Sequence, residues 1–189
     1  MSLDDKEVAA VKPDVLTPAE TAAKLETIGV NKINMPLSRS IILGILAGMF
    51  IAMGGMMLGL VLGDATLPIA IRRILGGLVF CVGLVLVLLS GAELFTGNNL
   101  IINATMSKKV KWGAYIKNLI IIWIANLVGS LIAVAIIYFS NFGGLYPDNA
   151  IANTFISLAA SKVALPPLTM FFKAILCNSV IPGNPPNSR

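Results

Sequence analysis

Three stretches of this 189-residue chain contain no charged side chain and are long enough to cross a membrane. They cover residues 40–63, 74–92 and 118–147, which is 24, 19 and 30 residues. Because a transmembrane helix needs about 20 apolar residues to cross a hydrocarbon core of about 30 Å, each stretch can form a span. Charged residues make up only 12% of the chain, whereas a soluble domain carries roughly 25%. The sequence therefore predicts an all-α polytopic membrane protein.

The composition also excludes several kinds of active site. The chain contains no histidine, which excludes a Ser/His/Asp triad, an HExxH zinc site and a histidine pH switch. Both cysteines lie in apolar stretches and indicate neither a disulfide framework nor a metal cluster. A membrane-embedded enzyme would need several ionisable groups within its spans, and Glu93 is nearly the only one. We therefore expect no enzyme, no metal, no cofactor and no nucleic-acid partner.

The polar segment at residues 1–38 precedes the first span and is predicted to be cytoplasmic. Residues 17–20, with the sequence TPAE, form a capping box with proline at the first helical position, and Gly29 is expected to end that helix. The segment predicts a short amphipathic helix against the membrane face. Positive charge is retained in cytoplasmic loops, and it is concentrated before the first span and between the second and third. We therefore expect a multi-pass protein of the inner membrane with its N-terminus in the cytoplasm. The basic residues on the predicted cytoplasmic side are Lys32, Arg39, Lys108, Lys109, Lys111 and Lys117, against Arg72, Arg73 and Lys162 on the other side.

The second span is too long to be one straight helix. Between Arg73 and Lys108 there are 34 residues with a single charge, Glu93. At 1.5 Å per residue a helix of that length would run to about 51 Å, well beyond the hydrocarbon thickness. Glycines, a carboxylate and two asparagines interrupt the apolar run at residues 91–99, which predicts a break there.

Two interpretations of the break remain open at this point. Irregular backbone at membrane depth is tolerated only where protein buries it or where it meets a water-filled cavity, and such breaks mark substrate sites in many transporters. Alternatively, residues 91–99 form a plain interfacial turn with Glu93 at headgroup level. For Glu93 itself, capping of backbone N–H groups is favoured over contact with a permeant anion.

Glycines four residues apart predict close packing between helices in the first span. The alternative is local flexibility of the chain. The glycines concerned are Gly44 and Gly48, followed by Gly55, Gly59 and Gly63.

The string GAELFTGN at residues 91–98 closely resembles the signature of the formate/nitrite transporter family. Residues 76–80 and 126–129 are similar to the same family, and residues 160–163 and 175–178 resemble its hydrosulfide/formate branch. The resemblance implies a homopentameric channel for small monovalent anions or their weak acids, namely formate, nitrite or hydrosulfide. It implies an aquaporin-like fold of two inverted repeats. Residues 39–178 would form the first repeat, with three spans and a broken second helix, and the start of a fourth helix.

The resemblance also implies roles for individual residues. Leu94, Phe95 and Thr96 would form the loop at the break and the constriction on the cytoplasmic side. Glu93, Gly97 and Asn98 would support the break.

Four further positions match the family's pore. Phe80 and Leu84 would form an apolar constriction, Lys162 a vestibule lysine, and Asn178 a pore-lining amide. A vestibule lysine concentrates anions, and an apolar ring favours passage of the neutral acid over the ion. The alternatives are lipid-facing or core packing for Phe80 and Leu84, an exposed loop for Lys162 and a helix–helix hydrogen bond for Asn178.

The sequence departs from the family in two respects. The family has a second repeat with a central histidine, and this chain has none. Residues 179–189 are rich in proline and glycine, so we expect a non-family tail on a C-terminally truncated channel. Whether such a truncated channel is active or inactive is left open by the sequence. The alternative function is a non-transporting membrane assembly or interaction protein, whose lysine-rich loop meets a cytosolic protein or anionic lipid.

Overall fold

The structure is a computed structural model that describes residues 16–180, with side chains described through residue 176. The expected tail at 179–189 therefore lies almost wholly outside the described residues, as do residues 1–15 of the N-terminal segment. All regular elements of the described part are helical. They are α2 (Pro18–Ile33), α3 (Leu37–Gly63), α4 (Ile69–Ser90), α5 (Phe95–Asn98), η1 (Asn99–Ile101), α6 (Ile102–Met106), α7 (Trp112–Phe139), η2 (Phe142–Gly144), η3 (Pro147–Asn149), α8 (Ala150–Val163) and α9 (Pro167–Val180).

Three of these helices are long and apolar enough to cross a membrane, as the sequence predicts. They are α3, α4 and α7, with 27, 22 and 28 residues. In the most apolar 18-residue stretch of each helix, only 22%, 17% and 22% of the stretch is buried by other described residues. The rest of that apolar surface needs a cover of lipid or protein, because a water-facing patch of this size is unstable. The all-α polytopic membrane fold is confirmed.

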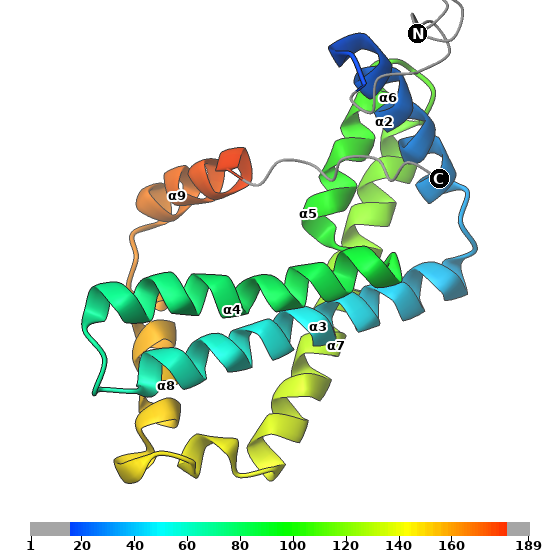
Figure 1. Cartoon of the computed structure of the whole chain (residues 1–189). Helices are drawn as coiled ribbons and strands as arrows, with labels where there is room; N and C mark the ends of the chain where they lie inside the picture. Colours follow the sequence, from blue (N-terminus) through cyan, green and yellow to red (C-terminus); the bar gives the residue numbers. More distant parts are fainter. Residues whose placement is uncertain (1–15, 181–189) are drawn as a thin grey trace, which may run out of the picture.

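Helix α3 lies at the centre and contacts α4, α7 and α8. Figure 1 shows α4 running back along α3, while α7 crosses both. At the crossing, a Cβ on Gly48 would fall on the backbone of Asn126, and a Cβ on Gly129 would fall on the backbone carbonyl of Ile45. Glycine therefore allows α3 and α7 to approach backbone to backbone, as the four-residue spacing predicts.

The second half of the predicted glycine stripe is partly wrong. Gly59 and Gly63 face Phe155 and Ile151 of α8, but a Cβ on Gly55 would meet no atom within 4 Å. Its neighbour Gly54 instead packs against Gly83 of α4, where a Cβ would lie 3.2 Å from the Gly83 Cα. In this half of α3 the four-residue spacing describes the side that meets α8, because α4 packs on another side of the helix.

The capping box at the start of α2 is confirmed. The Thr17 N–H donates to Glu20 Oε2 at 2.8 Å, and the Glu20 N–H donates to Thr17 Oγ1 at 3.3 Å. The expected end at Gly29 is wrong, because the helix continues to Ile33. Gly29 is buried, and a Cβ there would lie 3.0 Å from the Cβ of Ala104. This glycine allows α2 to pack on α6, so its role is close approach and not helix termination.

The expected start of a fourth helix corresponds to α9, which a sharp bend separates from α8, a helix that was not predicted. The chain bends by 109° between α8 and α9. Pro167 is the first residue of α9, a position that tolerates proline because its missing N–H has no helical partner there. In Figure 1, α9 stands apart from the other helices. Its side chains are exposed as far as they are described.

Candidate functional site at the broken helix

The second apolar helix breaks where the length argument predicts. Helix α4 ends at Ser90, and Gly91 adopts the left-handed conformation, with φ 65°. Glycine suits this helix-ending position because it has no Cβ to clash there. Residues 91–94 are irregular, and helix resumes with α5 at Phe95. The break therefore comprises the four residues 91–94.

The backbone of the break is hydrogen-bonded to the neighbouring spans. The Glu93 N–H donates to the carbonyl oxygen of Leu43 on α3 at 3.2 Å. The side chain of Asn126 on α7 accepts from the Phe95 N–H at 2.9 Å and donates to the Glu93 carbonyl oxygen at 2.8 Å. The same amide donates to the carbonyl oxygen of Gly44 on α3 at 2.8 Å. Asn126 thus joins the break to two spans and supplies the partners that lipid lacks.

The carboxylate of Glu93 is buried and paired with a lysine from another helix. Lys32 Nζ on α2 lies 2.6 Å from Glu93 Oε1, and the two side chains are 23% and 7% exposed. This burial favours a break inside the protein over a plain interfacial turn. Among the described residues, the Glu93 carboxylate accepts no backbone N–H, so the favoured interpretation of Glu93 as a backbone cap is wrong. The side chain of Asn126 supplies that cap, because it accepts from the Phe95 N–H.

The ion pair continues into a chain of amides. Lys32 Nζ also donates to Asn98 Oδ1 at 2.9 Å. The other end of this amide, Asn98 Nδ2, donates to Asn118 Oδ1 on α7 at 2.9 Å. Asn98 is 0% exposed, so its polar atoms depend on these partners. The network therefore connects α2, the break and α7 through three side chains around one buried carboxylate.

Pairing changes the electrostatics of the break. An unpaired Glu93 would leave a negative charge buried inside the protein, where water is scarce and charges interact strongly. The ammonium of Lys32 offsets that charge at contact distance. Removing one member of a buried ion pair costs about 3–5 kcal/mol, because the other charge is left without a partner. The break is thus electrically neutral only while α2 stays in place.

Two further sets of contacts hold α2 in place. Val30 and Ile33 pack against the buried cluster of Ile101, Ala104, Val110 and Tyr115.

The second set is polar. Glu26 pairs with Lys109 at 2.6 Å and also accepts a hydrogen bond from the Ser107 hydroxyl. These hydrogen bonds, from Lys109 first and then Ser107, hold the pKa of the Glu26 carboxyl below its ordinary value. Both sets place Lys32 at the break, since they secure the helix that carries it.

Some of the residues predicted by resemblance lie at the break, and others lie elsewhere in the fold. Leu94 and Phe95 are half-buried at the break, next to the buried Glu93, whereas Thr96 and Gly97 are exposed. Of the predicted residues, Glu93 and Asn98 are joined through the ammonium of Lys32, which donates to both.

The other predicted positions lie farther from the break. Phe80 and Leu84 are half-buried on α4, about 15 Å and about 9 Å before the end of that helix at 1.5 Å per residue. Lys162 is exposed in the last turn of α8, which packs on the Gly63 end of α3 and not near the break. The side chain of Asn178 lies outside the described residues.

Lys32, Asn118 and Asn126 carry the network but were not predicted as site residues. Asn118 and Asn126 are eight residues apart on one face of α7 and share it with the buried Ile122. Two amides on one face of an otherwise apolar span are a usable signal, because polar groups in a span need partners. No comparable signal exists for Lys32, whose partner Glu93 is 61 positions away.

Comparisons with known proteins agree with this geometry. The family model described as formate/nitrite transporter matches residues 19–183. The chain is 34% identical over 128 residues to the formate channel FocA of Escherichia coli K12, covering 67% of this chain and 45% of that protein. It is 32% identical over 142 residues to the nitrite transporter NirC of Salmonella typhimurium LT2, covering 72% of this chain and 49% of that protein.

A solved structure shows the same fold. An FNT family ion channel superposes with a TM-score of 0.73 at 26% identity, covering 84% of this chain and 64% of that one. The chain thus spans about half the length of the two curated relatives above.

Proposed function

We propose, because the chain belongs to the formate/nitrite transporter family, that it forms part of a transmembrane path for a small monovalent anion or its weak acid. The names of its relatives specify formate and nitrite, and hydrosulfide has the same charge and similar size. The observation that carries the proposal is the break after α4, with its ion pair of Lys32 and Glu93 inside the helical bundle. A break that is buried and hydrogen-bonded to the neighbouring spans is typical of a substrate site in a membrane protein.

At the break, Leu94 and Phe95 form the proposed constriction and Thr96 lies beside it. The two apolar side chains are half-buried and directly follow the neutralised carboxylate. An ion passing an apolar ring loses hydration, which costs several kcal/mol, whereas its neutral conjugate acid loses far less. The constriction therefore favours a solute that can exchange a proton on the way. No covalent step is part of this proposal.

A second apolar level is proposed at Phe80 and Leu84. The two residues are four apart on α4, so they share one face of that helix. Lys162 is the proposed vestibule cation that concentrates anions, and its exposure on α8 leaves it free to meet solutes. Asn178 is the proposed polar pore residue on α9, by its position in the family pattern.

The setting of this path is also part of the proposal. We place the chain in the inner membrane with the N-terminus in the cytoplasm. Helix α2 and the lysine-rich segment lie at the same end of the spans, as a cytoplasmic side requires. A pentamer with one path in each protomer would cover part of the apolar surface that α3, α4 and α7 expose.

Flux measurements on the whole chain test the proposal. The purified protein is inserted into liposomes, and formate and nitrite uptake are followed by stopped flow beside sulfate uptake and protein-free liposomes. We expect formate or nitrite uptake above the protein-free rate and no sulfate uptake. Phe95→Ala should raise acetate uptake relative to formate uptake, because a smaller side chain widens the constriction. The matched control, Phe139→Ala, alters a side chain that is 83% exposed at the end of α7 and should leave that ratio unchanged.

Two results would overturn the proposal. Correctly inserted protein with no uptake of either anion would favour the non-transporting assembly protein instead. An unchanged acetate-to-formate ratio in Phe95→Ala would remove the constriction from Phe95.

A further inference from the structure

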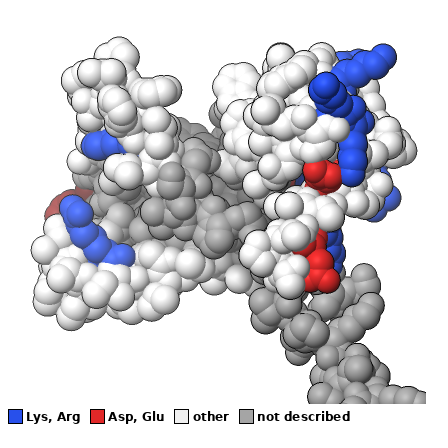
Figure 2. Space-filling model, turned by 90° about the horizontal axis from the view of Figure 1, so that it is seen from above, with Lys and Arg blue, Asp and Glu red and all other residues white. Residues whose placement is uncertain are grey.

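Four lysines gather between α6 and the beginning of α7, and their charges are not equally compensated. Lys109 pairs with Glu26 at 2.6 Å. The other three, Lys108, Lys111 and Lys117, are exposed and have no acidic partner within 4 Å among the described side chains. In Figure 2, lysine and arginine side chains appear on both lobes of the molecule, and a few acidic side chains lie among them. Three uncompensated positive charges therefore lie at one end of a spanning helix.

This end of α7 is placed at headgroup level by its own residues. Trp112 is the first residue of the helix and is 54% exposed. An exposed tryptophan at the end of a span is typical of the boundary between hydrocarbon and headgroups. Lys111 directly precedes it and Lys108 lies three residues earlier. Both charges therefore belong to the headgroup layer and not to the hydrocarbon.

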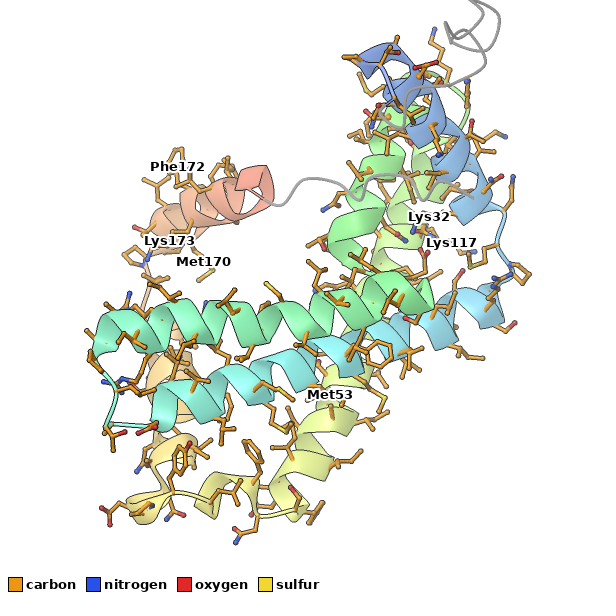
Figure 3. All side chains as sticks on the ribbon, viewed as in Figure 1. Lys32, Met53, Lys117, Met170, Phe172 and Lys173 are labelled. Atoms are coloured by element: carbon orange, nitrogen blue, oxygen red, sulfur yellow. The ribbon has the colours of Figure 1, made fainter. Side chains whose placement is uncertain are left out.

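Lys117 lies inside the span, on a face that continues into the hydrocarbon. Ile120 and Ile124 follow it at one-turn intervals and are 54% and 48% exposed. Side chains on a helix lean toward its N-terminus, so the lysine extends back over Gly113. A Cβ on Gly113 would meet no atom within 4 Å, which leaves room for the lysine stem. Its ammonium can thereby reach the level of Lys111, as long lysine side chains do at membrane boundaries. Figure 3 labels Lys117 in the part of α7 nearest α2, next to the label of Lys32.

We propose that this surface binds an anionic phospholipid, and we name it the α7 lipid surface. It consists of Lys108, Lys111, Trp112 and Lys117 with the isoleucines Ile120 and Ile124 below them. The three ammonium groups hold the headgroup phosphate, and an acyl chain lies along the two isoleucines.

Two features favour a lipid over other occupants. A free phosphate would use the lysines but leave the adjoining apolar face uncovered. A second copy related by a two-fold axis would bring the same three positive charges against these, which is unfavourable. In the proposed pentamer, a neighbouring copy would have to present unpaired acidic side chains here, whereas Glu26 and Glu93 at this end of the molecule are already paired within their own chain. Only a molecule with a negative head and an apolar tail matches both halves of the surface.

Fluorescence quenching by brominated lipids tests this inference. In a Trp123→Phe background, Trp112 is the only tryptophan of the chain and reports the lipids beside it. The protein is inserted into phosphatidylcholine liposomes that contain a small fraction of either brominated phosphatidylglycerol or brominated phosphatidylcholine. We expect stronger quenching by the phosphatidylglycerol. Each lysine replaced by glutamine should weaken that preference by about fivefold, the effect of one lysine at an anionic membrane surface.

Two controls separate the possible occupants. Lys173→Gln removes one charge from the exposed α9, as each test variant does from the α7 lipid surface, and should leave the preference unchanged. Inorganic phosphate at high concentration should not abolish the preference, because it cannot replace the acyl chain. Equal quenching by the two lipids, complete loss with phosphate alone, or protection of Trp112 from both lipids by a second copy would each overturn the inference.

Discussion

The ammonium of Lys32 lies 2.6 Å from the carboxylate of Glu93. A positive charge on α2, the helix before the first span, therefore neutralises a negative charge at the break that follows α4. The pair does two things at once. It fixes α2 against the break, and it removes a negative charge from the proposed path of an anion. The geometry of the break thus depends on a residue outside the membrane-spanning helices.

Replacing Lys32 by methionine should destabilise the protein strongly. Methionine keeps most of the side-chain volume but leaves the Glu93 carboxylate, 7% exposed, without its cation. The expected loss is about 3–5 kcal/mol in the free energy of unfolding, the usual cost of an orphaned buried charge. Denaturant unfolding in detergent micelles measures this loss.

The double variant Lys32→Met with Glu93→Gln separates charge from packing. It should recover part of the stability, because no buried charge remains unpaired. Lys173→Met, on the exposed face of α9, is the matched control and should change stability little. A double variant as unstable as the sum of its parts would show that the two side chains do not interact.

Asn126 should control the conformation of the break. Asn126→Leu removes the acceptor of the Phe95 N–H and the donor to the Glu93 carbonyl oxygen. Each unsatisfied group costs about 1–3 kcal/mol, and hydrogen exchange of the Phe95 amide should become faster. Ser130→Ala is the control on the same helix, since within the described part of the chain that hydroxyl donates to the Leu127 carbonyl oxygen of α7 itself. Unchanged exchange at Phe95 in Asn126→Leu would contradict the assignment.

Substitution of single glycines should distinguish the packed face of α3 from the open one. Gly48→Ala places a methyl group on the backbone of Asn126, which no side-chain rotation can relieve. Overpacking of this kind costs about 1–3 kcal/mol or more. Gly55→Ala has open space and should be neutral or stabilise by up to about 1 kcal/mol, because alanine favours helix. Melting temperatures of the two variants in one detergent measure the difference, and equal melting temperatures would argue against the α3–α7 crossing.

The contact between Glu26 and Lys109 should make stability depend on acid pH. The pKa of Glu26 is lowered in the folded protein below its ordinary value of 4.5, chiefly by the hydrogen bond from Lys109. The contribution of Glu26 to the free energy of unfolding is therefore complete above pH 4.5. It disappears as the pH falls through the lowered pKa of the folded protein. Glu26→Gln should flatten this part of the stability profile. Unfolding midpoints of both proteins between pH 6 and about pH 3 supply the comparison.

The spans and the break could be predicted from the sequence because both follow from length. A charge-free run of 20 or more residues has few alternatives to a membrane helix, and the run from Arg73 to Lys108 is too long to be straight. Gly91 then allows the left-handed turn at the break. By contrast, a glycine near the end of a predicted helix can either terminate that helix or let another helix pack closely on it, and the local sequence does not distinguish these two roles. Gly29 was predicted to end α2 and instead packs on Ala104.

The polar network could be predicted only in part. Glu93 and Asn98 lie in the recognisable string at residues 91–98, and Asn118 and Asn126 share a face of α7. The pairing of Lys32 with Glu93 depends on how α2 docks on α6, which is a tertiary contact with no periodic signal. Lys32 therefore contributed to the predicted orientation but not to the predicted site.

The central claim is that the break beside Glu93 borders a water-accessible path for small anions. Cysteine accessibility tests it most directly, in a chain whose native cysteines, Cys81 and Cys177, are replaced by serine. Thr96→Cys should react with a membrane-impermeant thiol reagent in liposomes, and formate or nitrite should slow that reaction. Leu89→Cys, 81% exposed on the apolar face of α4, should not react, because lipid covers it. A Thr96→Cys that does not react from either side of the membrane, or that reacts at the same rate with and without the anions, would contradict the account.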